Sequence, residues 1–227
     1  MEKYISKKEK ASYGFAAVGS YMVAGITQSY LMYFFTDILI IPSAFVMMLM
    51  IVARVWDALN DPMMGVTVDR TSTKYGKMRP YVLVGSFLML VTTIVLFMPL
   101  TGAPTMFKMI FAAVSYIIFG MAYTLTDVPA MGLMSVATPN SDERASLLSF
   151  YVTVGSVGSL LPVGLLTIFQ SFIPEKYVYF AMSIFVGIIT SAAYLTLFKN
   201  SKERFSTHTE KIAVRDMIKA AGKNKPM

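Results

Sequence analysis

Four stretches of this chain contain no charged residue for long enough to cross a lipid bilayer, and this feature restricts the possible fold more than any other. A transmembrane helix needs about 20 mostly apolar residues, and each stretch reaches or exceeds that length. The stretches are Ala11 to Thr36, Pro80 to Phe107, Ala145 to Pro174 and Tyr177 to Phe198. Only 15% of all residues are charged, against roughly 25% in soluble domains. Lipid is therefore the expected solvent for most of the chain.

Two further apolar stretches, from about Pro42 to Val68 and from Thr105 to Val136, are also long enough to span but carry interior charges. Backbone groups in lipid must be hydrogen-bonded internally, and the short alternating pattern of a membrane barrel is missing, so helices are expected. The sequence thus predicts an all-α integral membrane fold with six transmembrane helices. We expect an N-terminal segment at 1–10, a six-helix bundle at 11–198 and a basic tail at 199–227. Apolar residues at helical spacing from Ile212 to Ala221 predict an amphipathic helix in that tail.

Basic residues outside the predicted spans are distributed very unevenly. Alternate loops and the termini hold 17 of these 19 Lys and Arg residues, and the other two are Lys108 and Lys176. Because basic residues near span ends stay on the cytoplasmic side, both termini are predicted to be cytoplasmic in a multi-pass protein of the cell membrane. The formal net charge of +7 follows from this asymmetry and suits anionic lipid headgroups. No nucleic-acid partner is expected.

Three charged residues of the second span share one face. Arg54, Asp57 and Asp61 are spaced i, i+3 and i+7, which places them on one side of a helix with 3.6 residues per turn. Each charge at the centre of a membrane helix is unfavourable by ~2.5–3.5 kcal/mol, so this face is expected to look into the bundle. Asn60 adds an amide oxygen, and Pro62 can free a backbone carbonyl on its amino-terminal side. Oxygen ligands are therefore concentrated on this helix.

A second polar stripe lies on the fourth span. It consists of Gly120, Tyr123, Thr124 and Asp127, at i, i+3, i+4 and i+7. The two carboxylates of the second span repel each other unless a cation or a proton lies between them. Carboxylate, amide and hydroxyl oxygens suit a hard cation such as sodium, and the chain has no Cys for a softer metal. Alternatively, Arg54 neutralises Asp57 and the other polar groups only join helices, but three acids against one base favour a transported cation.

The first span also has a face of small and hydrogen-bonding residues, made of Tyr13, Ala17, Tyr21, Ala24 and Gln28. Such a face can line a polar cavity. Interfacial tyrosines and hydrogen bonds between helices explain the pattern equally well. Tyr21 and Gln28 are thus candidate substrate-binding residues, together with Tyr123 and Asp127.

Five ordered motifs make the chain resemble the glycoside, pentoside and hexuronide cation symporters, the melibiose permease group of the major facilitator superfamily. The most specific is ARVWDALNDPMMG, Ala53 to Gly65. The others are SYGFAAVGS at Ser12 to Ser20, YLMYFFTD at Tyr30 to Asp37, KYGKMRP at Lys74 to Pro80 and YTLTDVP at Tyr123 to Pro129. The resemblance covers nearly the whole chain and implies the six-helix amino-terminal half of that fold.

This resemblance also implies roles for single residues. In the family, sodium, lithium or proton binding is attributed to carboxylates that match Asp57 and Asp61, with contributions that match Asn60 and Thr124. The aspartate that matches Asp127 is associated with sugar binding beside the cation. The family also has a cytoplasmic loop between the second and third helices, and its charged contacts stabilise one conformation of the transporter. The residues that match this loop are Gly65, Asp69, Arg70, Gly76, Lys77 and Arg79. Alternatively, the loop contains basic residues only because such residues are retained on the cytoplasmic side of the membrane.

Two departures from the family pattern concern sugar recognition. A sugar-binding aspartate of the first helix is replaced by Tyr21, and an arginine of the fifth helix by Val152. Both losses remove charged hydrogen-bonding groups that make hydroxyl recognition strong, which argues against a galactoside. A different glycoside, a less polar solute and an amphiphile are the alternatives. The family also has twelve helices in two halves, whereas this chain matches one. We expect a truncated product rather than a natural half-transporter that dimerises.

Together these features predict a secondary active transporter that couples the symport of a sugar or related small solute, with a glycoside expected, to Na⁺ or H⁺. Sodium would bind Asp57 and Asp61, with Arg54 as charge partner, and membrane lipids and a carboxyl-terminal half would be the partners. No nucleophile and base pair is apparent, so an enzyme is not expected, and no cofactor is expected beyond the co-transported ion. The alternatives are an uncoupled facilitator and a non-transporting membrane scaffold.

Overall fold

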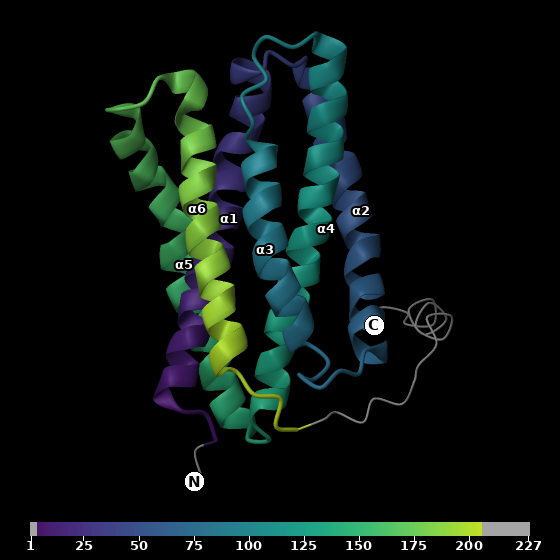
Figure 1. Cartoon of the computed structure of the whole chain (residues 1–227), viewed down its shortest axis with the longest axis vertical. Coiled ribbons are helices and arrows are strands. Elements are labelled where there is room, and N and C mark those ends of the chain that lie inside the picture. The colour runs from purple at the N-terminus through teal and green to yellow at the C-terminus, as the bar shows by residue number, and fades with distance from the viewer. Residues whose placement is uncertain (1–3, 206–227) are drawn as a thin grey trace, which may run out of the picture.

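Six long α-helices form one bundle in the computed structural model, which describes residues 4–205 (Figure 1). The elements are α1 Lys7–Tyr33, the π-helix η1 Phe34–Ile38, α2 Ser43–Arg70, α3 Arg79–Leu96, α4 Thr105–Ala137, α5 Ser141–Gln170 and α6 Glu175–Asn200. The all-α six-helix fold predicted from the sequence is confirmed. The amphipathic helix predicted at Ile212 to Ala221 lies outside the described residues.

Prolines and side-chain caps set where the helices begin. Pro42, Pro104 and Pro174 directly precede α2, α4 and α6, where a residue without an N–H leaves no donor unpaired. At α1 the hydroxyl of Ser6 accepts a hydrogen bond from the Glu9 N–H at 3.1 Å. This cap starts the helix at Lys7, so the end of the predicted segment 1–10 is already helical.

Five of the helices, α2 to α6, are long and apolar enough to cross a membrane. The 27-residue α1 is long enough but less apolar, because glycine, serine and tyrosine are frequent along it. It lies between α5 and α6, and many of its side chains are buried there. A helix surrounded by protein needs fewer apolar residues than one that faces lipid.

The helix contacts repeat in two sets of three. The packing of α1 on α5 and α6 corresponds to that of α4 on α2 and α3, and α3 packs on α6 between them. Exchanging α1, α2 and α3 for α4, α5 and α6 therefore reproduces the main contacts. Because matching helices are three positions apart in a chain whose successive helices alternate in direction, corresponding helices run in opposite directions (Figure 1). This is the arrangement of inverted three-helix repeats, which the residue pattern alone had not revealed.

Glycines allow the closest helix crossing, between α1 and α5. A Cβ atom on Gly25 would lie 2.5 Å from the backbone oxygen of Ser159, and one on Gly158 would lie 2.8 Å from that of Val18. Neither backbone can move aside easily, so both positions require glycine. Small residues that bring backbones together are a common means of packing helices in membranes.

A buried lysine holds the end of the bundle opposite the first and last described residues. Lys108 lies in the first turn of α4, and its ammonium donates a 2.9 Å hydrogen bond to the Leu39 carbonyl just beyond η1. In the sequence this residue served only as one of the two basic residues counted on the less basic side of the membrane. Its position shows a structural use as well, since a cation at a helix carboxyl end is favourable.

The first and last described residues lie together at the other end (Figure 1). Tyr4 packs edge-on against Phe205 with 5.7 Å between ring centroids. Arg204 forms a 2.7 Å ion pair with Glu9, which is buried. The hydrogen bonds with Glu9 raise the pKa of Arg204, so its guanidinium stays charged at any physiological pH. The segment after α6 is thereby fixed against the start of α1.

Candidate functional site

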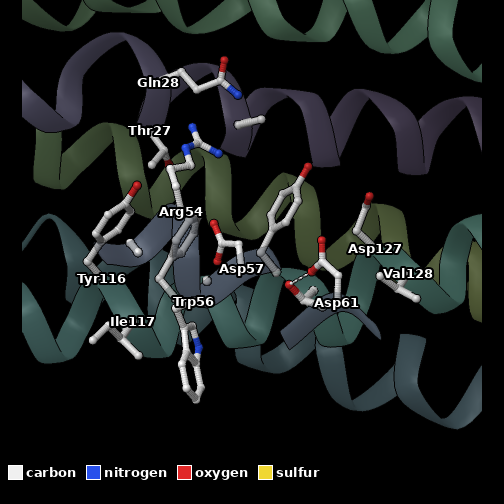
Figure 2. A pocket seen from close by; sticks show the side chains of 16 residues that line it. Thr27, Gln28, Arg54, Trp56, Asp57, Asp61, Tyr116, Ile117, Asp127 and Val128 are labelled. Atoms are coloured by element: carbon white, nitrogen blue, oxygen red, sulfur yellow. Dashed lines mark hydrogen bonds between the residues drawn. The ribbon is translucent and has the colours of Figure 1, made fainter. Parts of the chain in front are cut away.

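A cavity of about 250 Å³ opens between α1, α2 and α4 (Figure 2). Its polar lining comes from all three helices. The lining residues are Ala24, Thr27, Gln28, Ala53, Arg54, Trp56, Asp57, Asp61, Tyr116, Ile117, Phe119, Gly120, Tyr123, Thr124, Asp127 and Val128. Three carboxylates and one guanidinium thus face the same open cavity, in which Arg54 and Asp61 are exposed and Asp57 and Asp127 are half-buried.

The carboxylates of α2 are fitted against α4. The Thr124 hydroxyl donates a 2.8 Å hydrogen bond to Asp61 Oδ1. One turn earlier on α4, a Cβ on Gly120 would lie 3.1 Å from Asp57 Oδ1, so glycine leaves this carboxylate its space. Figure 2 shows both carboxylates pointing into the cavity. Two carboxylates and a hydroxyl in one place form an oxygen-only ligand set that suits a hard cation or a proton.

Arg54 shares this cavity but does not form a close ion pair with Asp57. Among the described residues, Glu9 and Arg204 are the one pair within 4.0 Å. The Arg54 guanidinium points toward the side of the cavity formed by α1, where Thr27 and Gln28 lie (Figure 2). Its charge therefore acts on the carboxylates through space, and their ligand oxygens are not blocked by it.

Two predicted site residues lie elsewhere. Asn60 is not among the residues that line the cavity, although it directly precedes Asp61 on α2. Tyr21 also lies outside this lining. Its ring packs on Gly155 and meets the ring of Tyr151 edge-on at a centroid distance of 6.2 Å. Val152 on α5 is exposed. Gln28 and Tyr123, which were predicted as candidate substrate-binding residues, line the cavity.

Asp127 belongs both to the cavity and to a cluster of hydroxyl groups. Its Oδ1 accepts hydrogen bonds from Ser20 at 2.8 Å, Tyr194 at 3.3 Å and Tyr151 at 3.5 Å. Ser20 is also 3.2 Å from the hydroxyl of Tyr123. The sequence analysis missed Ser20, Tyr151 and Tyr194. The one available hint was that a tyrosine inside an apolar span needs a hydrogen-bond partner.

The predicted conformational loop is held by a carboxylate from beyond α6. Glu203 accepts hydrogen bonds from three successive backbone N–H groups, those of Lys77 at 2.8 Å, Met78 at 2.9 Å and Arg79 at 3.0 Å. These groups lie at the start of α3, where backbone donors and the helix dipole favour an anion. Gly76 precedes them with φ of +105°, and a Cβ there would collide with Glu203. Glycine is thus required at this turn.

The other residues of that loop are placed differently. Arg79 donates from Nη2 to the Phe198 carbonyl at 2.7 Å and stacks on the Phe198 ring. Asp69 and Arg70 are exposed at the end of α2, and Gly65 has open space beside it. Asp69 lines a second cavity of about 220 Å³ with Lys77 and Glu203. These loop residues therefore gather at the same end of the bundle as the first and last described residues.

A bundle of spanning helices with a charged cavity between α1, α2 and α4 defines a multi-pass membrane protein with a polar site among its helices. The chain belongs to the family described as MFS/sugar transport protein, which matches residues 12–227. It is 32% identical over its whole length to 50% of the uncharacterized symporter YjmB of Bacillus subtilis. It is 31% identical over 89% of its length to 44% of the putative glycoside/cation symporter YagG of Escherichia coli.

A further relative is the isoprimeverose transporter of Lactiplantibacillus pentosus, 28% identical over 96% of this chain and 47% of that protein. The chain spans about half the length of these curated relatives. Since the family model and several symporters match over nearly every residue, the resemblance found in the motifs is confirmed.

Proposed function

We propose that this chain is the amino-terminal half of a cation-coupled symporter for a sugar or related small solute, in the cell membrane with its termini in the cytoplasm. The observation that carries the proposal is the cavity that Asp57, Asp61 and Asp127 share. In it Asp61 accepts a hydrogen bond from Thr124, which is one helix turn from Asp127 on α4. A cation site and a solute site on one turn of α4 can influence each other directly. The names of the relatives support the solute class and the coupling.

In this proposal, Na⁺ or H⁺ binds first between Asp57 and Asp61. The cation removes the repulsion between the two carboxylates, and the Thr124 hydroxyl contributes a further ligand oxygen. Thr124 and Asp127 are three residues apart on α4 and are neighbours on one face of the helix, so fixing the Thr124 side chain also restricts the Asp127 side chain. A hydroxyl of the solute then donates to Asp127, while Tyr123 and Gln28 line the same space. Coupling of this kind is reciprocal and typically amounts to about 1–3 kcal/mol.

No chemical step is part of this function. Alternating exposure of the cavity to the two sides would carry both ligands across, through movement of this six-helix unit against a second one. The need for such a partner is supported by the length of the relatives, of which this chain spans about half.

The test is the melting temperature of the detergent-purified chain as sodium replaces potassium at constant ionic strength. Sodium at about 100 times its Kd should stabilise the folded chain by about 2.7 kcal/mol, by linkage. Asp57→Asn should abolish the rise. The matched control is Asp37→Asn, which alters an exposed carboxylate outside the cavity and should retain the rise.

A rise that is insensitive to Asp57→Asn would contradict the proposed cation site. A flat sodium response accompanied by a pH-dependent melting temperature that Asp57→Asn removes would assign the coupling to protons. If neither sodium nor pH acts through Asp57, an uncoupled facilitator or a scaffold describes the chain better.

A further inference from the structure

One oxygen atom of Asp127 connects four helices. Asp127 is on α4, and the three hydroxyls that donate to its Oδ1 come from Ser20 on α1, Tyr151 on α5 and Tyr194 on α6. Tyr151 and Tyr194 are among the most deeply buried side chains of the bundle. The carboxylate is therefore held from three directions by groups that cannot easily rearrange.

The hydrogen bonds in this cluster have a defined direction. Ser20 has a single hydroxyl proton, which it donates to Asp127 at 2.8 Å. The Ser20 oxygen also lies 3.2 Å from the Tyr123 hydroxyl. Because the Ser20 proton is already used, Tyr123 donates this second hydrogen bond and Ser20 accepts it. A chain of donors thus runs from Tyr123 through Ser20 to Asp127 Oδ1. Tyr123, the first donor of this chain, is itself a lining residue of the cavity.

The second carboxylate oxygen of Asp127 is free for a ligand. Within residues 4–205, Oδ2 accepts no hydrogen bond, and it is not among the side-chain atoms that are buried without a partner. Since Asp127 lines the cavity, Oδ2 is the oxygen that reaches it. Three donors saturate one oxygen, and the other remains an acceptor that points at the solute space.

We propose that Ser20, Tyr151 and Tyr194 are positioning residues of the substrate site, which fix Asp127 by Oδ1 so that Oδ2 alone accepts a hydroxyl from a neutral, polyhydroxylated solute. The inference rests on the proposed function and specifies its solute. Preorganised acceptors bind more tightly because the site does not have to be ordered on binding. An anionic solute would meet the free oxygen of a carboxylate and be repelled.

The single tryptophan of the chain provides the readout. Trp56 lines the same cavity, so its fluorescence reports on a solute that enters there. The experiment titrates isoprimeverose into the purified chain in saturating sodium, with fully O-methylated isoprimeverose as a probe of similar shape without donors. The variants are Tyr151→Phe, Tyr194→Phe and Ser20→Ala, and Asp127→Asn shows the effect of losing the carboxylate.

The matched control is Tyr13→Phe. Tyr13 is fully buried on α1, but its hydroxyl has no partner among the described residues and is not part of this cluster. Removing that hydroxyl tests the general effect of a buried Tyr→Phe change. The melting temperature of every variant is measured in parallel, because a purely structural network would lower stability without changing affinity for the solute.

We expect Tyr151→Phe, Tyr194→Phe and Ser20→Ala each to raise the Kd of isoprimeverose about fivefold to tenfold, toward that of Asp127→Asn. Tyr13→Phe should leave it unchanged, and the O-methylated sugar should not bind. An unchanged Kd in all three cluster variants, with or without lower melting temperatures, would overturn the positioning role. If the unsubstituted chain shows no response to isoprimeverose while its sodium effect is intact, sugar recognition by this half fails, and the positioning proposal fails with it.

Discussion

At the scale of single residues, Gly120 is the position where α4 makes room for a carboxylate of α2. Gly120→Ala would place a methyl group 3.1 Å from Asp57 Oδ1, closer than carbon and oxygen normally approach. The carboxylate must then shift by a few tenths of an ångström. We expect the Kd for sodium to rise about threefold to tenfold in the melting-temperature titration.

A matched variant separates this effect from that of replacing any helical glycine. Gly164→Ala on α5 adds a methyl group where no atom lies within 4 Å, so the sodium titration should not change. Equal sodium affinity in Gly120→Ala and the unsubstituted chain would show that Asp57 is not confined by α4.

At the scale of the helices, the crossing of α1 and α5 depends on backbone contact. Gly158→Ala would put a Cβ 2.8 Å from the Val18 carbonyl oxygen and force the helices apart. Overpacking of this kind destabilises by typically about 1–3 kcal/mol. Reversible unfolding in mixed micelles measures the change, with Gly164→Ala on the same helix as the reference. A loss no larger than that of the reference would mean that the crossing is loose.

The start of α3 is the second element whose structure depends on a distant residue. Glu203→Gln keeps the shape of the side chain but removes its charge and one of the two accepting oxygens. The Lys77 N–H, which donates to Oε2, then loses its acceptor. We expect its hydrogen exchange to quicken about tenfold or more, while amides in the middle of α3 stay protected.

Glu175→Gln is the control for this exchange measurement. Glu175 accepts a hydrogen bond from the Tyr33 hydroxyl at the opposite end of the bundle. Its substitution should leave the exchange of the Lys77 amide unchanged. If Glu203→Gln likewise had no effect, the loop before α3 would be ordered by its own turn rather than by the segment after α6.

At the scale of the whole molecule, orientation in the membrane can be tested cleanly because the sequence contains no cysteine. Ser72, in the loop between α2 and α3, and Ser171, directly after α5, are exposed at opposite ends of the bundle. With cytoplasmic termini, an impermeant maleimide should label Ser171→Cys in intact cells and Ser72→Cys only after permeabilisation. The reverse pattern would invert the proposed topology.

The class of fold was accessible from the sequence because lipid imposes a simple rule on it. Segments that cross a bilayer must be long, apolar and helical, so six spans could be located before any contact was known. Helical spacing likewise put Asp57 and Asp61 on one face, and Thr124 and Asp127 on another. Only α1 deviates from the rule, since protein rather than lipid surrounds it.

Spacing along one helix does not show which neighbour its polar face meets, and this was decided by the tertiary structure. Asn60 and Tyr21 seemed to belong to the polar stripes, yet the rotation of α1 and α2 in the bundle places both outside the cavity lining. The pairing of Thr124 with Asp61 needed the contact between α2 and α4. Tyr151 and Tyr194 reach Asp127 from helices whose sequences show mainly apolar residues. Such clusters depend on long-range packing, and a one-dimensional pattern contains no information about the distance between helices.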